Sequence, residues 1–261
     1  MKILFIGDIV AGVSRKAIIE KLPTIKNEFS IDFCIANAEN LAGGAGITKA
    51  VLKEFPHGLI DVFTAGDHVW DQKKFQNEVN EIENFLRPAN LKSSQPGKGW
   101  NIFHTGTTKI AVINLIGRVF MKDNFAECPF ENAELILKKI PEDTKIIIVD
   151  FHAEATSEKA ALARYLDGKI SALIGTHTHV QTNDAQILPY GTAFITDVGM
   201  TGPNNSILGR EINDVITKFI SGMPTRLEVA KGEIRFDSVI IDIDENSGKA
   251  INIKNISKIL N

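Results

Sequence analysis

Residues 172–184 read ALIGTHTHVQTND, an apolar run that leads directly into His177 and His179. A short apolar run bounded by polar residues is typical of a buried strand that ends in a loop. The chain has only six histidines among its 261 residues, so a pair at one strand end asks for an explanation. Taken alone, the pair could consist of ordinary packing or surface residues. The other strand ends decide between that interpretation and a binding site.

Four other apolar runs also end in polar side chains. These side chains are Asp8 after residues 2–7, Glu39 and Asn40 in residues 31–40, Asp67 and His68 in residues 59–68, and His152 in residues 144–154. In open α/β sheets, ligands bind in the crevice beyond the carboxyl ends of the strands. We therefore expect these side chains to meet at one end of the fold.

Segments with helical spacing alternate with the strands. They cover residues 14–29, which Pro23 is expected to kink or split, and residues 48–55, 71–86, 157–168 and 211–222. Two further segments predict hairpins, residues 99–120 with a turn near Gly106 and residues 226–244 with a turn at Lys231-Gly232. Strands that alternate with helices indicate a layered α/β sheet. No repeat or linker divides the sequence, so we expect a single domain over residues 1–261.

The composition narrows the class of protein. A net charge of −3 shows no basic excess of the kind that binds long nucleic acids. No stretch reaches the roughly 18 apolar residues of a membrane helix, and the first residues do not resemble a signal peptide. The two cysteines, Cys34 and Cys128, lack the spacing of a zinc site or a disulfide framework. We expect a globular protein of the cytoplasm.

The residue types at the strand ends indicate metal chemistry. Imidazoles combined with carboxylate and carboxamide oxygens suit zinc, iron or manganese. The chain offers more such ligands than one ion needs: Asp8, Glu39, Asn40, Asp67, His152, His177 and His179. Two ions about 3.5–4 Å apart and bridged by a carboxylate would use all of them, and such a pair clamps a phosphoryl group. His68 is left over, and its imidazole suits protonation of a leaving oxygen.

The order of these motifs is familiar. GDIV, NAEN, TAGDHVWD, DFHAEATSEK, GTHTHVQTND and TDVGMTGP, together with RPAN and GMPTR, resemble the YmdB-like branch of the calcineurin-like metallophosphoesterases. The resemblance covers nearly the whole chain. It implies a layered α/β sandwich in which two central mixed sheets are flanked by helices. It also implies a dinuclear site and phosphodiesterase activity, including activity toward 2′,3′-cyclic nucleotides.

The resemblance assigns a role to each candidate residue. The first metal would be held by Asp8, Glu39, Asn40 and His179, and the second by Glu39, Asp67, His152 and His177. Glu39 would bridge the two ions, a metal-bridging hydroxide would attack phosphorus, and His68 would donate the proton. The two transition-metal ions would be divalent or trivalent. Iron or manganese is expected, and zinc is an alternative.

One position departs from the family pattern. The family has Gly-Asn-His at the end of the third strand, whereas this chain has Gly66-Asp67-His68. An aspartate can bind a metal where an asparagine does, but it adds a negative charge beside the phosphate. We expect Asp67 to strengthen metal binding and to weaken the attraction of the anionic substrate.

Two other functions stay open on the sequence. One is a phosphomonoesterase that acts on nucleotides or sugar phosphates. The other is a regulatory protein that binds a nucleotide or an RNA end and turns it over slowly, which Asp67 favours. A purely structural metal site is disfavoured, because such sites prefer closed sets of four ligands with thiolates. The expected partner is thus a small phosphodiester or nucleotide, and the family also suggests a homo-oligomer.

Overall fold

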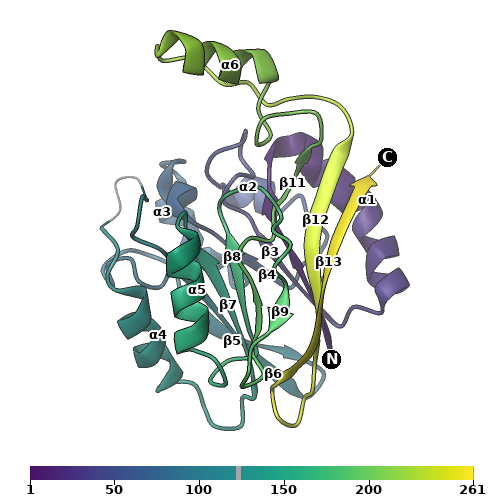
Figure 1. The fold of residues 1–261 in the computed structure, drawn as a ribbon, viewed down its shortest axis with the longest axis vertical. Helices are drawn as coiled ribbons and strands as arrows, with labels where there is room; N and C mark the ends of the chain where they lie inside the picture. Colours follow the sequence, from purple (N-terminus) through teal and green to yellow (C-terminus); the bar gives the residue numbers. More distant parts are fainter. Residues whose placement is uncertain (122–124, 261) are drawn as a thin grey trace.

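The computed structural model describes residues 1–121 and 125–260, in which the strands form two sheets (Figure 1). The seven-stranded sheet has the order β2 (Asp8–Ile9), β11 (Met200–Pro203), β12 (Ile234–Ile243), β1 (Lys2–Ile6), β3 (Phe33–Asn37) and β4 (Val62–Thr64), with β13 (Ala250–Leu260) paired to β12. The six-stranded sheet has the order β5 (Trp100–Thr105), β6 (Thr108–Ile116), β7 (Ile146–His152), β8 (Ala172–Thr176), β10 (Ala193–Ile195) and β9 (Gln186–Ile187). Both sheets mix parallel and antiparallel pairs, for example β1 with β3 and β1 with β12.

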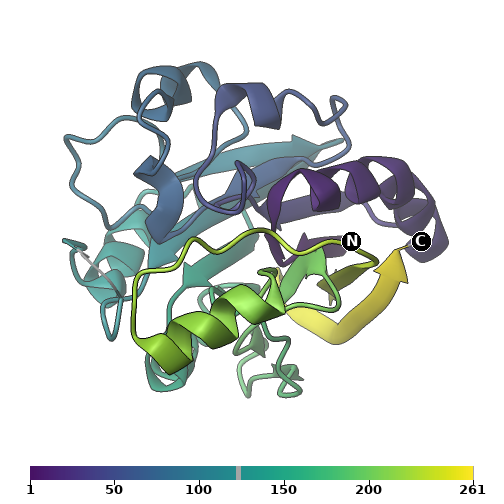
Figure 2. The ribbon, with the colours of Figure 1, turned by 90° about the horizontal axis from the view of Figure 1, so that it is seen from above.

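Helices cover the outer faces of the two sheets. Figure 1 shows α1 (Ala11–Phe29) on one side of the sandwich, and α4 (Pro129–Leu137) and α5 (Thr156–Tyr165) on the other. The short helices are α2 (Lys49–Leu52), η1 (Asp67–Trp70), α3 (Phe75–Glu78) and η2 (Val79–Glu81), and α6 (Ile212–Ser221) projects from one end of the sandwich (Figures 1 and 2). Helix α1 runs on through Pro23 without a break. This arrangement confirms the predicted α/β sandwich with two central mixed sheets and flanking helices.

Strand β1 shows how the sequence builds the layers. Successive side chains of a strand point to opposite faces of its sheet. Ile3 and Phe5 pack between the two sheets, against residues such as Ile148 of β7. Leu4 and Ile6 pack on the other face, in the cluster that contains the buried side chains of α1. Both faces of the strand are therefore apolar, which is the pattern of a strand covered on both sides.

The predicted helix over residues 71–86 is wrong. That segment contains only α3 and η2, and the rest is turn and loop. The rings of Phe75 and Phe85 pack edge to face with their centroids 5.0 Å apart. A continuous helix would separate two residues ten positions apart by about 15 Å along its axis. Burial of both aromatic rings in one cluster therefore requires the chain to turn back.

The predicted hairpin over residues 226–244 is also wrong. Strand β12 pairs along its length with β13, and the turn of this hairpin lies in residues 244–249, where Gly248 has a φ of 73°. The other edge of β12 is shared by β1 and β11. Both edges are thus occupied, which leaves none for residues 226–231. The predicted hairpin of β5 and β6 is confirmed, with Gly106 in its turn.

No helix within the described ranges is long and apolar enough to span a lipid bilayer.

Gly175 in β8 tests how tightly the strands behind the site are packed. A methyl group added at Gly175 would lie 1.8 Å from the carbonyl oxygen of Thr196. Gly175→Ala should therefore lower the free energy of unfolding by about 2 kcal/mol or more. Urea denaturation measures the change. In the control Gly12→Ala, the methyl group meets only the flexible Arg15 side chain, at 3.4 Å. This variant should change stability by less than about 1 kcal/mol, and equal stability of the two variants would contradict the packing argument.

Candidate metal centre

The seven predicted ligands meet where the two sheets adjoin. Asp8, Glu39, Asn40 and Asp67 come from the ends of strands in the seven-stranded sheet, and His152, His177 and His179 come from the ends of β7 and β8 in the other sheet. Two groups of side chains have ligand atoms within 4.8 Å of one another, and Glu39 belongs to both groups. The predicted convergence of the strand ends is therefore found in the fold.

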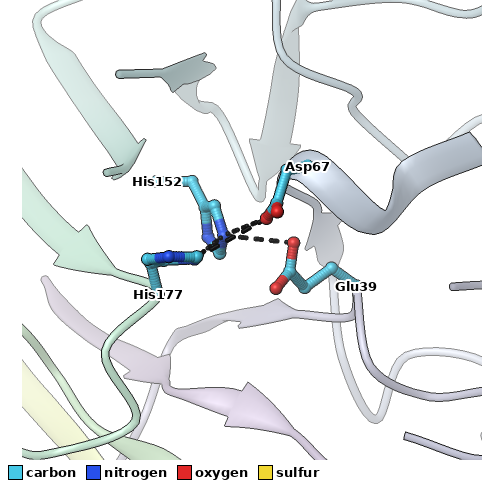
Figure 3. A group of neighbouring side chains, drawn as sticks. All are labelled: Glu39, Asp67, His152 and His177. Carbon is cyan, nitrogen blue, oxygen red and sulfur yellow. Dashed lines mark hydrogen bonds and ion pairs between the residues drawn. The ribbon is translucent and has the colours of Figure 1, made fainter. Parts of the chain in front are cut away.

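The first group consists of Glu39, Asp67, His152 and His177 (Figure 3). His152 Nε2 lies 3.1 Å from Glu39 Oε2 and 3.2 Å from Asp67 Oδ1. His177 Nδ1 lies 2.9 Å from His152 Nε2 and 3.6 Å from Asp67 Oδ1. Two imidazole nitrogens and two carboxylates thus point toward a common centre.

The second group consists of Asp8, Glu39 and His179, and Asn40 lies beside it. The Asn40 amide nitrogen donates to Glu39 Oε1 at 3.1 Å and lies 3.2 Å from His179 Nε2. Asp8 Oδ2 accepts a hydrogen bond from the backbone N–H of His177 at 3.2 Å. The other carboxylate oxygen of Asp8 is buried and has no hydrogen-bond partner in residues 1–121 and 125–260.

The charges of these groups favour a bound cation. Burial raises the pKa of Asp8 well above its usual range, and the nearby carboxylates outweigh burial to raise the pKa of His152. Burial alone would raise the pKa of Asp67, but the hydrogen bond and charge of His152 hold it well below its usual range. One imidazolium therefore has to compensate several buried carboxylates. Buried carboxylates normally pair with cations or bind metals, and the Asp8 oxygen that lacks a hydrogen bond fits that requirement.

Each histidine is oriented by a hydrogen bond from its other ring nitrogen. His152 Nδ1 lies 2.9 Å from the hydroxyl of Thr176, and that hydroxyl donates to Asp150 Oδ1 at 2.8 Å. The network places a proton on His152 Nδ1, and Nε2 is the nitrogen that faces the carboxylates of Glu39 and Asp67 and could bind a metal. Asp150 is fully buried and also accepts from Asn37 and Thr64. Asp150 therefore supports His152 through Thr176 without belonging to either ligand group.

His177 and His179 follow the same design. Glu154 Oε2 lies 3.1 Å from His177 Nε2, which leaves Nδ1 to face the cluster. His179 Nδ1 donates to the carbonyl oxygen of Leu208 at 3.3 Å, which leaves Nε2 to face Asn40. Metal-binding histidines commonly donate their second N–H to a carboxylate or carbonyl in this manner.

His68 stands apart from both groups. Its Nδ1 lies 2.8 Å from Asp71 Oδ2, and its side chain lines a cleft of about 340 Å³ that opens onto the cluster. Burial lowers the pKa of His68, but the carboxylates of Glu39, Asp67 and Asp71 outweigh burial and raise it. Asp71 is not among the predicted site residues, although its spacing of three residues from His68 in a helical turn places the two side chains on one face.

A buried ion pair supports residues 177–179, which we call the histidine loop. Lys159 Nζ in α5 lies 2.8 Å from Asp197 Oδ2, and both side chains are fully buried. The same carboxylate accepts from the backbone N–H of Thr178 at 2.9 Å and of Gly199 at 2.8 Å. Thr178 lies between His177 and His179, and the carbonyl of Gly199 accepts from the N–H of Asp8. Asp197 thereby orients both sides of the candidate site. Asp197 lies in the motif TDVGMTGP, but nothing in the sequence pairs it with Lys159.

Known proteins resemble this chain over nearly its whole length. A family model described as YmdB-like protein matches residues 4–256. The chain is 43% identical to a protein of Bacillus subtilis named 2′,3′-cyclic-nucleotide 2′-phosphodiesterase, over 98% of this chain and 96% of that protein.

Two solved structures are similar along the whole chain. A hypothetical protein from Thermus thermophilus has a TM-score of 0.92 and 36% identity, and the alignment covers 100% of both chains. A structure described as a novel phosphatase from Mycoplasma pneumoniae has a TM-score of 0.91 and 34% identity, with 99% of this chain and 93% of that chain covered.

Removal of Lys159 tests the buried ion pair. Lys159→Met leaves the Asp197 carboxylate buried without its cation, so the free energy of unfolding should fall by about 3–5 kcal/mol. Metal content after gel filtration should fall as well, because Asp197 orients the histidine loop. In the control Lys169→Met, the ion pair that is lost joins Lys169 to Glu134 at the protein surface. The control should lose less than about 1 kcal/mol and retain its metal. Similar losses in the two variants would argue against a special role for Asp197.

Proposed function

Because the chain belongs to the YmdB-like protein family, we propose that it is a metal-dependent phosphodiesterase of small nucleotides, with 2′,3′-cyclic nucleotides as substrates. The chain is an enzyme, a phosphoric diester hydrolase of the metallophosphoesterase class. The observation that carries the more detailed proposal is the place of Glu39 in both groups of ligand atoms. A carboxylate shared by two such groups is what a dinuclear site needs.

Each ligand group would hold one ion. One ion would be bound by Asp8, Glu39, Asn40 and His179, and the other by Glu39, Asp67, His152 and His177. Nitrogen and oxygen ligands without thiolates suit iron or manganese, and zinc also fits. When bound, such a pair of ions activates a water nucleophile and neutralises the charge that develops on the phosphoryl oxygens.

His68 would act on the opposite side of the reacting phosphorus. Asp71 holds the Nδ1 side of its imidazole, so the proton available to a substrate sits on Nε2. The carboxylates near His68 favour its protonated form. Protonation of the leaving oxygen by His68 would prevent release of a free alkoxide.

The partners follow from this activity. The substrate would be a small phosphodiester or nucleotide, and short RNA ends that carry a 2′,3′-cyclic phosphate have the same reactive group. A homo-oligomer, a single domain and a cytoplasmic location stay predictions.

Substitution of His68 tests the proposed proton donor. His68→Ala should reduce kcat for 2′,3′-cyclic AMP by about 10²–10⁴-fold, the usual contribution of a general acid. Its metal content should stay at two ions per chain, because His68 belongs to neither ligand group. Turnover with manganese or iron and elemental analysis provide the two measurements. His104, which is exposed on β5, serves as the control position for a His→Ala substitution. A wild-type protein that binds two ions but hydrolyses no diester would contradict the proposal, and faster turnover of monoesters would favour a phosphomonoesterase.

Substitution of Asp67 tests the effect of the additional charge. Asp67→Asn removes a carboxylate 3.2 Å from His152 Nε2. Metal affinity should fall by about tenfold or more, equivalent to ~1.4 kcal/mol. With saturating metal, kcat/KM should rise because the anionic phosphate meets less negative charge. Titration with Mn²⁺ and steady-state kinetics measure the two effects. A very large gain in rate would indicate that the natural protein functions mainly in binding, whereas a lower rate at saturating metal would refute the charge argument.

A further inference from the structure

Leu208 combines two unfavourable features at the edge of the cleft. Its backbone φ of 52° lies in the left-handed region, which disfavours residues other than glycine, asparagine and aspartate. Its side chain is also 47% exposed, although it is a leucine. The same side chain lines the cleft that leads to the candidate metal centre. Strained residues of this kind cluster at functional sites, so we ask whether Leu208 contacts the substrate.

The backbone conformation of Leu208 has a reason of its own. Its carbonyl oxygen accepts the hydrogen bond from His179 Nδ1, and the turn is closed by Ser206, whose hydroxyl oxygen accepts from the N–H of Gly209. An asparagine or a glycine would adopt this backbone with less strain. The turn therefore explains the backbone conformation but not the choice of an apolar side chain.

Arg210 lies next to Leu208 along the cleft wall. Its guanidinium donates to the carbonyl oxygens of Leu227, at 3.2 Å, and of Gly44 and Gly43. A methyl group added at Gly44 would lie 2.8 Å from Cζ, Nη1 and Nη2 alike, so Gly44 lies against one face of the guanidinium plane. These carbonyl groups fix the orientation of the planar guanidinium. Within residues 1–121 and 125–260, the guanidinium forms no ion pair.

The residues that line the cleft differ in chemistry. The candidate metal centre and His68 provide for the phosphate and its leaving oxygen. Leu208 offers an apolar side chain to the cleft, and Arg210 offers a planar guanidinium that is backed by Gly44. Because carbonyls occupy N–H groups of Arg210, its plane is better suited to stacking than its edge is to binding an anion. Nucleobases stack on guanidinium planes and pack against apolar side chains.

We infer that Leu208 and Arg210 form a binding wall for the nucleobase, so that the enzyme prefers cyclic phosphates that carry a base. This inference rests on the proposed phosphodiesterase activity and names the part of the substrate that the metal centre does not bind. The cleft of about 340 Å³ is within the size range of small-molecule sites.

The test compares two substrates, 2′,3′-cyclic AMP and the base-free ribose 2,3-cyclic phosphate. The wild-type protein should hydrolyse 2′,3′-cyclic AMP with the higher kcat/KM. In Leu208→Asn, the ratio of the two kcat/KM values should fall by about tenfold, mainly through the KM of the nucleotide. Leu208→Met restores an apolar side chain and should keep the ratio within about twofold of the wild type. Arg210→Lys keeps the charge but removes the plane, and should also lower the ratio.

Matched controls separate recognition from structure. Leu135→Asn makes the same change at an exposed leucine of α4, and Arg226→Lys does so at an arginine that is 89% exposed, both outside the cleft. Neither control should change the ratio. Equal losses on the two substrates in Leu208→Asn would overturn the inference, because they would leave Leu208 only its contact with His179. A wild-type protein that does not discriminate between the substrates would overturn it too.

A binding experiment separates this inference from the proposed activity. If the wild-type protein hydrolyses neither substrate, the proposed function fails. In that case, the affinities for 3′-AMP and ribose 3-phosphate, measured by calorimetry, still test the binding wall. Tighter binding of 3′-AMP that weakens in Leu208→Asn would support it, and equal affinities for the two compounds would refute it.

Discussion

The burial of several carboxylates around one imidazole is the constraint on which the rest of the structure depends. Asp8, Glu39 and Asp67 approach His152 in a region that water does not reach freely, where an uncompensated negative charge is costly. A protein that keeps such a group has to supply cations and to hold the ligands rigidly. The two sheets meet this demand together, because each contributes the ends of its parallel strands to the same place. The cluster is stable only when both sheets are in position.

The support for this cluster extends outward in ordered steps. Thr176 and Asp150 orient His152, Glu154 orients His177, and the carbonyl of Leu208 orients His179. Beneath the loop, the buried pair of Lys159 and Asp197 orients the backbone between the two histidines. A buried ion pair often adds little net stability compared with apolar packing. The geometry that this pair maintains at the ligands is a better reason for its presence here.

The fold follows from the sequence where local patterns and tertiary contacts agree. The buried strands, the α/β layers and the hairpin at Gly106 are visible as apolar runs and turn residues. The prediction fails for residues 71–86, because the contact between Phe75 and Phe85 bends a segment with helical periodicity. It fails for residues 226–244, because β13 occupies the edge of β12 that a local hairpin would need. In both cases a contact distant in sequence outweighs the local preference.

The sequence by itself determined which residue types stand at the strand ends, and these types already indicated metal-dependent phosphoester chemistry. It also determined that a carboxylate, Asp67, stands directly before His68. Only the tertiary structure decided how the ligands divide into two groups that share Glu39, since residues from separate strands meet only when the sheets are assembled. The tertiary structure likewise paired His68 with Asp71 and Lys159 with Asp197, and brought Leu208 and Arg210 to the cleft. Hydrogen bonds and ion pairs act over a few ångströms, and sequence spacing does not specify such distances between separate elements.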